Sequence, residues 1–217
     1  MTRRLAAALC GTLALLAVPV RLAGQFSFHG RGTIGRAEHR VLDAGASVVS
    51  SGTLLGGALG FVGGEWEVWA EVMGGRLAAA DSPAMEDREI AEVALLASVR
   101  VRPWLRLRGG PWVRSYFNTL ARQRWTMLRF GAEARVPLAV ESVRVVLRGD
   151  WMPIANVSGL QRPEIAFAAG VGLEWRRKRI GVSTLYTLER YDFPANAGGR
   201  RLEEFAALQI RTSVRWR

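Results

Sequence analysis

Residues 164–175 read EIAFAAGVGLEW, and apolar side chains occupy every second position of this stretch from Ile165 to Trp175. The positions between them hold only alanine, glycine and glutamate. Successive side chains of a β-strand point to opposite faces of a sheet, so a period of two residues indicates a strand with one apolar face. The stretch is also long enough to cross a membrane when tilted, which takes roughly 9–11 residues.

The same alternation recurs in residues 65–72, 105–108, 128–136, 143–148 and 206–216. It predicts ten strands, at residues 26–35, 46–62, 65–76, 88–101, 104–117, 124–136, 142–152, 164–176, 179–190 and 202–216. Short connections fall near residues 63–64, 102–103, 137–141 and 177–178, and longer ones near 36–45, 77–87, 118–123, 153–163 and 191–201. Short turns on one rim and longer loops on the other are typical of transmembrane barrels.

Two segments leave an alternative open. Residues 46–62 are rich in glycine and alternate poorly. Residues 82–100 begin with Ser82-Pro83 and continue with alanine, glutamate and leucine, as a helix would. The strand interpretation is favoured because residues 93–101 alternate and because a barrel of this kind has an even number of strands. Ten strands is therefore the prediction, and eight strands is the alternative.

Alternation by itself does not say which face of each strand points outward. In a soluble, lipocalin-like barrel the apolar face points inward, whereas in a membrane barrel it faces lipid. Tryptophans at strand ends favour the membrane barrel, because aromatic side chains gather at membrane interfaces. We predict an aromatic girdle formed by Trp66, Trp175 and Trp216 beside the short turns and by Trp151 near the opposite rim.

The polar faces of the strands carry both signs of charge in abundance. In a narrow lumen such groups can pair through charge-assisted and sometimes bidentate hydrogen bonds. Arg114, Asp150 and Glu174 share these faces. The predicted lumen charge network consists of Glu65, Glu67, Glu71, Glu92, Arg106, Arg108, Arg129, Glu133, Arg135, Arg144, Arg148 and Arg211.

The N-terminus has the layout of a secretory signal peptide. Arg3 and Arg4 precede an apolar stretch of 14 residues, 5–18, and small residues follow at Ala23 and Gly24. This stretch is shorter than the roughly 20 residues of a membrane-spanning helix, which favours a cleaved export signal over a retained anchor. The predicted domain organisation is a signal peptide at residues 1–24 and one barrel at residues 25–217.

Residues 26–217 resemble the small outer-membrane β-barrel proteins of Gram-negative bacteria. The last strand, LQIRTSVRW at residues 208–216, resembles the aromatic-ended strand that the barrel assembly machinery reads, although Arg217 follows it. The resemblance implies an all-β, transmembrane, antiparallel up-and-down β-barrel in the outer membrane. It also implies a monomer whose partners are outer-membrane lipids and the barrel assembly machinery.

Charge and cysteine content exclude several function classes. The formal charge of +11 comes almost entirely from arginine, since Lys178 is the only lysine. A nucleic-acid binder would gather such charges on one face or in runs, but the only dense run is residues 176–179, so no nucleic-acid partner is predicted. The single cysteine, Cys10, lies within the export signal, which leaves the mature chain without a disulfide or a cysteine metal site.

Candidate catalytic groups are few. The only histidines are His29, predicted on the polar face of the first strand, and His39, predicted in the first loop. A metal site needs three or four converging ligands, so neither a metal nor a cofactor is predicted. His39 with Asp43 or Asp192 is the one conceivable catalytic pair at the loop rim.

The sequence therefore predicts a non-enzymatic outer-membrane barrel with no catalytic residues, serving as a structural element, a narrow pore or a surface-binding module. Two alternatives stay open. One is an enzyme with its site at the loop rim that acts on lipid or peptide. The other is a soluble, exported, lipocalin-like barrel.

The export signal gives a first testable prediction. The mature protein should begin within a few residues of Gln25, because the small residues there end the signal layout. N-terminal sequencing of the protein recovered from bacterial membranes measures this directly. A chain that still begins at Met1 would contradict the prediction.

Overall fold

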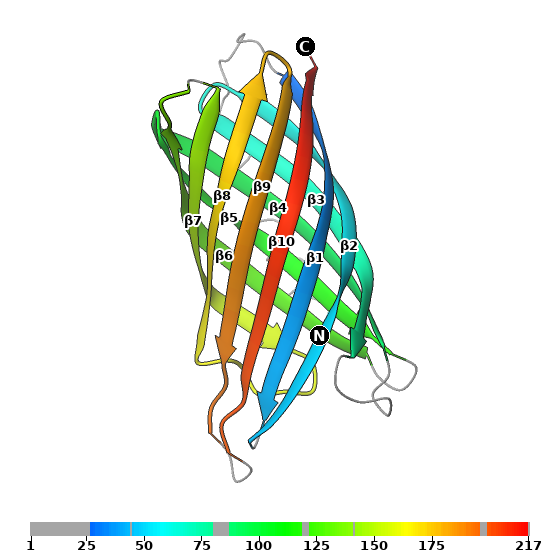
Figure 1. The fold of residues 1–217 in the computed structure, drawn as a ribbon. Coiled ribbons are helices and arrows are strands. Elements are labelled where there is room, and N and C mark those ends of the chain that lie inside the picture. The colour runs from blue at the N-terminus through cyan, green and yellow to red at the C-terminus, as the bar shows by residue number, and fades with distance from the viewer. Residues whose placement is uncertain are drawn as a thin grey trace, which may run out of the picture.

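The computed structural model describes residues 27–43, 45–79, 87–118, 122–140, 142–195 and 199–216, and these form one closed antiparallel barrel (Figure 1). Ten strands follow one another around the wall, and the first closes the ring by pairing with the last. The strands are β1 (Ser27–Asp43), β2 (Ala46–Gly63), β3 (Trp66–Ala79), β4 (Arg88–Arg102), β5 (Leu105–Phe117), β6 (Arg122–Pro137), β7 (Val143–Val157), β8 (Ile165–Arg177), β9 (Ile180–Asp192) and β10 (Leu202–Trp216). The predicted signal peptide lies outside the described residues.

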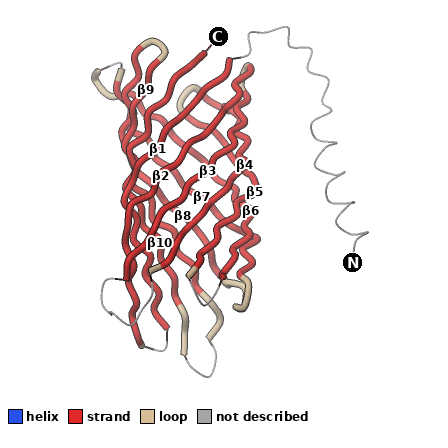
Figure 2. Tube along the Cα trace, turned by 90° about the vertical axis from the view of Figure 1, so that its right-hand side faces the viewer, coloured by secondary structure: helices blue, strands red, loops and turns tan. Residues whose placement is uncertain are grey.

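The predicted ten-stranded, all-β fold is confirmed, and the eight-stranded alternative is wrong. Residues 88–102 form strand β4 rather than a helix, and residues 46–63 form strand β2. Figure 2, turned from the first view, shows strands around the whole described wall. No helix among the described residues is long and apolar enough to cross a membrane. Two-residue turns join β2 to β3, β4 to β5 and β8 to β9 on the rim where β10 ends, at the top of Figure 1. The longest connections, after β3, β7 and β9, lie on the opposite rim, which also carries the short turn between β1 and β2.

The longer loop expected at residues 36–45 is wrong, because β1 continues through these residues to its end at Asp43. Inward and outward side chains still alternate in this segment, but here the charged residues point outward and the less polar ones point inward. His39 is buried inside the barrel, whereas Arg36 and Arg40 are exposed on the outer face. The segment therefore has the composition of a solvated loop, although its backbone remains paired with β2 and β10.

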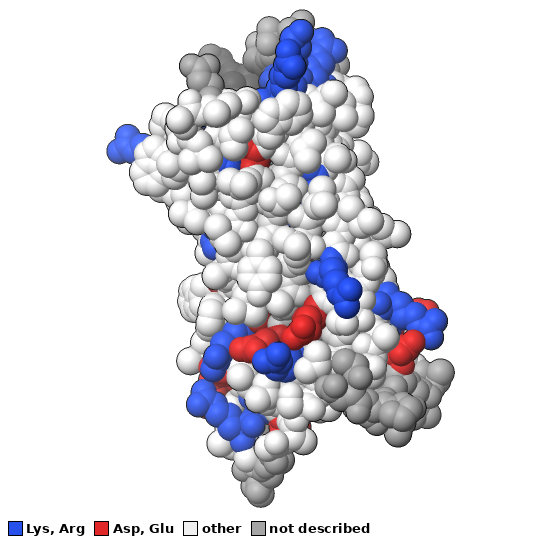
Figure 3. All heavy atoms as spheres, viewed as in Figure 1, with Lys and Arg blue, Asp and Glu red and all other residues white. Residues whose placement is uncertain are grey.

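Large apolar side chains cover the outside of the wall. Leu55, Leu59 and Trp151 are 61%, 72% and 63% exposed, and most outward positions between the rims are of this kind. Figure 3 shows a mostly uncharged band between charged side chains at the upper end and a mixed cluster in the lower third. Such a surface is stable against lipid rather than water, so the wall has the inside–outside sense of a transmembrane barrel.

The strands are longer than a membrane requires. They contain 13 to 18 residues, against the roughly 9–11 that cross a bilayer when tilted. Outward apolar residues give way to charged ones at Arg36, Arg76, Arg190 and Glu204 on four of the strands, which then continue toward the longer loops. The loop-side ends of these strands therefore project beyond the apolar band.

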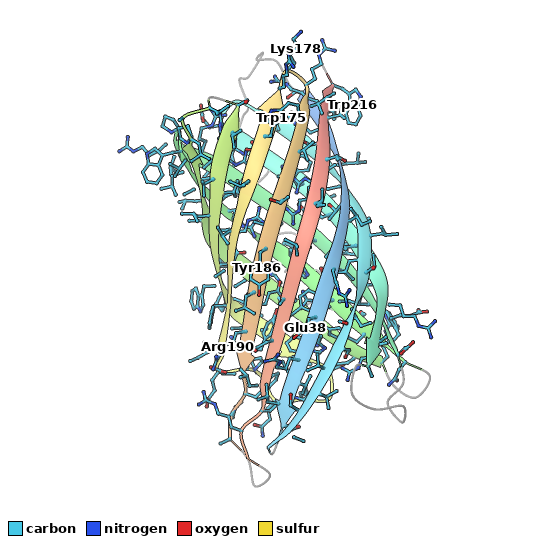
Figure 4. The ribbon with its side chains drawn as sticks, viewed as in Figure 1. Glu38, Trp175, Lys178, Tyr186, Arg190 and Trp216 are labelled. Carbon is cyan, nitrogen blue, oxygen red and sulfur yellow. The ribbon has the colours of Figure 1, made fainter. Side chains whose placement is uncertain are left out.

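Aromatic side chains mark the edges of this band. Figure 4 places Trp175 and Trp216 on the outside near the upper rim, with Lys178 above them. Trp66 is also outward and 56% exposed beside the turn before β3. Trp151 lies on the outer face in the loop-side half of β7, where its register neighbours are Phe130 and Phe167. Trp66, Trp175 and Trp216 thus lie beside the short turns, as expected of interfacial aromatic residues, whereas Trp151 lies close to the middle of β7 rather than near its rim.

Glycine explains the weak alternation of residues 46–62. A Cβ atom at Gly60 would lie 2.5 Å from the Trp69 indole ring, and one at Gly52 would lie 1.8 Å from the carbonyl oxygen of Arg76. Glycine therefore lets β2 and the groups of β3 approach each other closely. The irregular pattern reflects crowding along this pair of strands rather than the absence of a strand.

Two matched substitutions on β8 test the position of the bilayer. Val171 and Ile165 are both outward and about half exposed, at 49% and 50%, but Val171 lies at mid-strand and Ile165 at the loop-side end. In phospholipid vesicles, Val171→Arg should lower the free energy of unfolding by about 2–4 kcal/mol and Ile165→Arg by about 0–1 kcal/mol. Urea titration of the refolded protein measures both. Equal losses would mean that water, not lipid, surrounds the wall.

Candidate functional site: the barrel interior

The loop-side half of the interior is an apolar core. Its members come from all ten strands and from the connection after β9. Side chains in a core of this kind pack closely against one another. The buried residues of the core are Ala37, Leu54, Leu77, Ile90, Tyr116, Trp125, Met127, Met152, Ala155, Val157, Ala166, Ala168, Tyr191, Phe193, Phe205 and Ala207.

A buried ion cluster lies next to this core. Arg114 Nη1 lies 2.8 Å from Glu189 Oε2, and Arg114 Nε donates to Glu92. Arg129 Nη2 lies 2.7 Å from Glu189 Oε1, and the Tyr191 hydroxyl donates to Glu189 Oε2 at 2.7 Å. All five side chains are buried. Two carboxylates and two guanidinium groups thus neutralise one another across β4, β5, β6 and β9.

The arginines of this cluster also contact aromatic faces. The Arg114 guanidinium carbon lies 4.0 Å from the centre of the Phe205 ring, and that of Arg129 lies 3.7 Å from the centre of the Trp112 ring. Planar guanidinium groups stack well on aromatic rings, and desolvation strengthens this attraction. The cluster therefore joins the apolar core to the charged part of the interior.

Further ion pairs fill the half beside the short turns. Arg108 holds Asp150 in a bidentate pair, with Nε 2.8 Å from Oδ1 and Nη2 2.6 Å from Oδ2. Glu133 accepts from Arg135 Nε at 2.7 Å and from Arg148 Nε at 3.1 Å. These partners lie on neighbouring or nearby strands, β5 to β7, because the narrow barrel brings inward side chains together.

Two more pairs complete the set on the β3 side. Arg31 Nη1 lies 3.1 Å from Glu71 Oε1, and Arg106 pairs with Glu67. The Arg31 guanidinium also lies 4.1 Å from the centre of the Trp69 ring. Glu174 pairs with Arg176 at 3.0 Å nearer the rim.

Three members of the predicted network are placed differently. Glu65 belongs to the turn before β3, where its exposed side chain pairs with Arg100 at 3.2 Å, so its assignment to the lumen is wrong. Face alternation does not extend into a turn, which explains the error. Arg144 forms no ion pair with any described residue. Arg211 points inward but binds an amide, the Gln209 side chain, rather than a carboxylate.

Sequence analysis missed two central residues, Glu189 and Arg31. Glu189 lies on the same inward face of β9 as Ser183, and Arg31 lies on the same inward face of β1 as His29. The signal is weak because inward Leu185 interrupts the polar face of β9 and glycines interrupt the outer face of β1. The importance of these two residues becomes clear only from their ion-pair partners across the lumen.

The conceivable catalytic pair at the loop rim, His39 with Asp43 or Asp192, is not formed. His39, predicted in a loop, is buried inside β1, where its Nε2 lies 3.0 Å from Glu203 Oε2 and its ring stacks on Tyr116 with 4.8 Å between centres. Asp43 pairs instead with Arg201 at 2.9 Å, and Asp192 with Arg190 at 3.3 Å. The described residues contain no group of three side chains suited to hold a metal ion.

The free space in the interior is small and uneven. A cavity of about 90 Å³ lies in the half beside the short turns. Three smaller cavities, of about 30, 30 and 50 Å³, lie deeper, among the ion pairs. One water molecule needs roughly 10–15 Å³ of such space, so these smaller cavities have room for no more than a few waters each.

No family model matches the chain, and no curated protein matches its sequence. In fold, the chain is similar to the outer membrane protease OmpT of Escherichia coli, with 11% identity, 88% of this chain and 96% of OmpT covered, and a TM-score of 0.54. Neisserial surface protein A aligns at 9% identity over 88% of this chain and 99% of its own, with a TM-score of 0.41. Ail of Yersinia pestis aligns at 13% identity over 87% and 98%, with a TM-score of 0.38. The likeness to OmpT shows a shared barrel fold.

A pair of arginine substitutions tests how strongly the buried cluster holds the barrel. Arg114→Met should lower the free energy of unfolding by about 3–5 kcal/mol, because it removes the ion-pair partner of buried Glu92 and leaves buried Glu189 with Arg129 alone. Arg100→Met removes an exposed pair with Glu65 and should cost under about 1 kcal/mol. Both values come from urea titration in the same vesicles. A loss at Arg114 as small as that at Arg100 would mean that water reaches the cluster freely.

Proposed function

We propose that this chain is an integral outer-membrane β-barrel of non-enzymatic and non-conducting type, which acts as a structural or surface-binding module. The observation that carries the proposal is the filled interior. An apolar core occupies the loop-side half, and buried ion pairs occupy the middle. If no solute can pass through the lumen, a partner can contact only the lipid-facing wall and the two rims.

The wall supports the location and the partners. Its apolar band and interfacial tryptophans fit outer-membrane lipids. Trp216 ends β10 on the outer face, as expected of a strand that the barrel assembly machinery reads. The ring closes within one chain, which favours a monomer, and inward pairing of many arginines favours the absence of a nucleic-acid partner.

A narrow pore is the less favoured function. The deeper cavities of about 30–50 Å³ lie among tightly paired charges, and aromatic side chains such as Trp125 and Tyr191 lie beyond them. An ion that crossed would have to break buried pairs or open the core. Both changes are costly because the groups are desolvated.

A rim enzyme is the second candidate, because OmpT, which shares the fold, is a protease. Against it stand the contacts of the rim acids. Asp43, Asp192 and Glu203 are each paired with arginine, and Glu203 also bonds His39, which is buried. A general base needs access to its substrate, and this histidine lacks it.

Two measurements on the refolded protein test the proposal. In a planar bilayer, it should give no resolved channel openings, because the core closes the lumen. Steady single-channel currents would make it a narrow pore instead. Incubated with casein or with phospholipid, the protein should give no turnover. Turnover that disappears in Asp192→Asn, while the barrel still folds, would identify the rim as an active site.

A further inference from the structure

The cavity beside the short turns, which we call the vestibule, has an excess of positive charge. Its lining contains five arginines and three glutamates, together with His29 and the hydroxyl groups of Ser183 and Ser213. It reaches the rim at Arg176, whose side chain is 45% exposed. Most of the arginines are inward residues of the wall, so their charges converge on one small space. The arginines are Arg31, Arg135, Arg148, Arg176 and Arg211, and the glutamates are Glu67, Glu133 and Glu174.

The ion pairs already described use up the carboxylates of this lining. Glu133 is shared by Arg135 and Arg148, and Glu174 pairs with Arg176 at 3.0 Å. Glu67 pairs with Arg106, which lies outside the lining. No carboxylate of the lining is therefore left to neutralise a further guanidinium group.

Arg211 is the guanidinium group left over. Its Nε and Nη2 donate at 3.1 and 2.6 Å to the same neutral acceptor, Gln209 Oε1. No carboxylate of a described residue lies within ion-pair distance of it, and it lines the vestibule and two of the deeper cavities. A partly buried guanidinium with spare donors and no anionic partner is a costly arrangement unless an anion completes it.

The surroundings of Arg211 suit an oxyanion. Ser183 is its register partner on β9, and Ser213, whose hydroxyl donates to the Gly181 carbonyl oxygen at 3.4 Å, lies two residues along the same inward face. Arg31 and Arg148 belong to the same lining and carry further donors. Guanidinium groups bind phosphate through paired N–H donors, and hydroxyl groups supply additional ones. A volume of about 90 Å³ limits the guest to a small group, because one water takes roughly 10–15 Å³ of it.

We propose that the vestibule is a binding site for a small oxyanion, namely inorganic phosphate or the phosphate of a small monoester, which enters from the short-turn rim and binds Arg211. This inference goes beyond the proposed function, and it holds whether or not the barrel conducts ions. The site needs no catalytic group and no movement of the wall. Binding leaves the existing ion pairs intact, since Arg211 has no carboxylate to lose.

The test measures phosphate binding to the full barrel refolded in a zwitterionic detergent. Isothermal titration calorimetry with inorganic phosphate, and separately with glycerol phosphate, should show saturable binding with one site per chain at constant ionic strength. Binding of inorganic phosphate alone would limit the site to the free ion, and binding of both would admit monoesters. No saturable binding of either ligand would overturn the proposal.

Two variants and one matched control locate the site. Arg211→Gln should weaken phosphate binding roughly 10- to 100-fold, the range expected for loss of charged hydrogen bonds. Arg177→Gln removes the same charge from the outside of the same rim and should leave the affinity unchanged. Equal weakening in both variants would show that phosphate responds only to net charge, and would overturn the assignment.

Ser183→Asp keeps the test decisive if Arg211→Gln fails to fold. It places a carboxylate opposite Arg211 in the β9–β10 register, so the added side chain should occupy the anion's place. Phosphate binding should be lost, while the midpoint of urea unfolding stays the same or rises. Wild-type affinity in a folded Ser183→Asp barrel would mean that phosphate binds elsewhere.

Discussion

The structure depends on one constraint, which is that hydrocarbon offers no hydrogen-bonding partner to a peptide group. A sheet that crosses a membrane must therefore close on itself, and here β1 pairs with β10 along fifteen consecutive residue pairs from Phe28 to Leu42. Closure with ten strands leaves a narrow interior. Every inward side chain must then find its partner across a short distance, which determines both the ion pairs and the core.

The interior changes character along the barrel axis. Apolar residues fill the loop-side half, and the cluster around Glu189 joins them to the charged half. Toward the short turns the pairing becomes less complete, and Arg211 is left with an amide as its acceptor. The buried part is thus held by packing and by ion pairs, whereas the part that meets the rim keeps a guanidinium group without a carboxylate partner among the described residues.

The inner and outer faces of the wall exchange polarity where the strands extend beyond the apolar band. Outward positions become charged from Arg36 onward on β1, while inward positions become apolar or are buried as His39 is. Beyond the band the barrel follows the rule of a soluble protein, with water outside and a packed core within. This reversal explains why a histidine that suggested rim chemistry is instead a buried group bonded to Glu203.

The sequence by itself determined the number of strands and which residues share a face, because a period of two assigns each side chain to a face, but it missed the continuation of β1 through residues 36–43. The sense of the wall followed from the tryptophans at strand ends rather than from the alternation. Residues 164–175 and the alternating arginines of β5 and β6 carry this information locally. Only the tertiary structure decided that Glu189 meets Arg114 and Arg129, that Glu65 stays outside, and that Arg211 has no carboxylate partner within the described part of the chain. The reason is physical: alternation fixes the face of a residue, whereas closure and register fix which residues meet across the lumen.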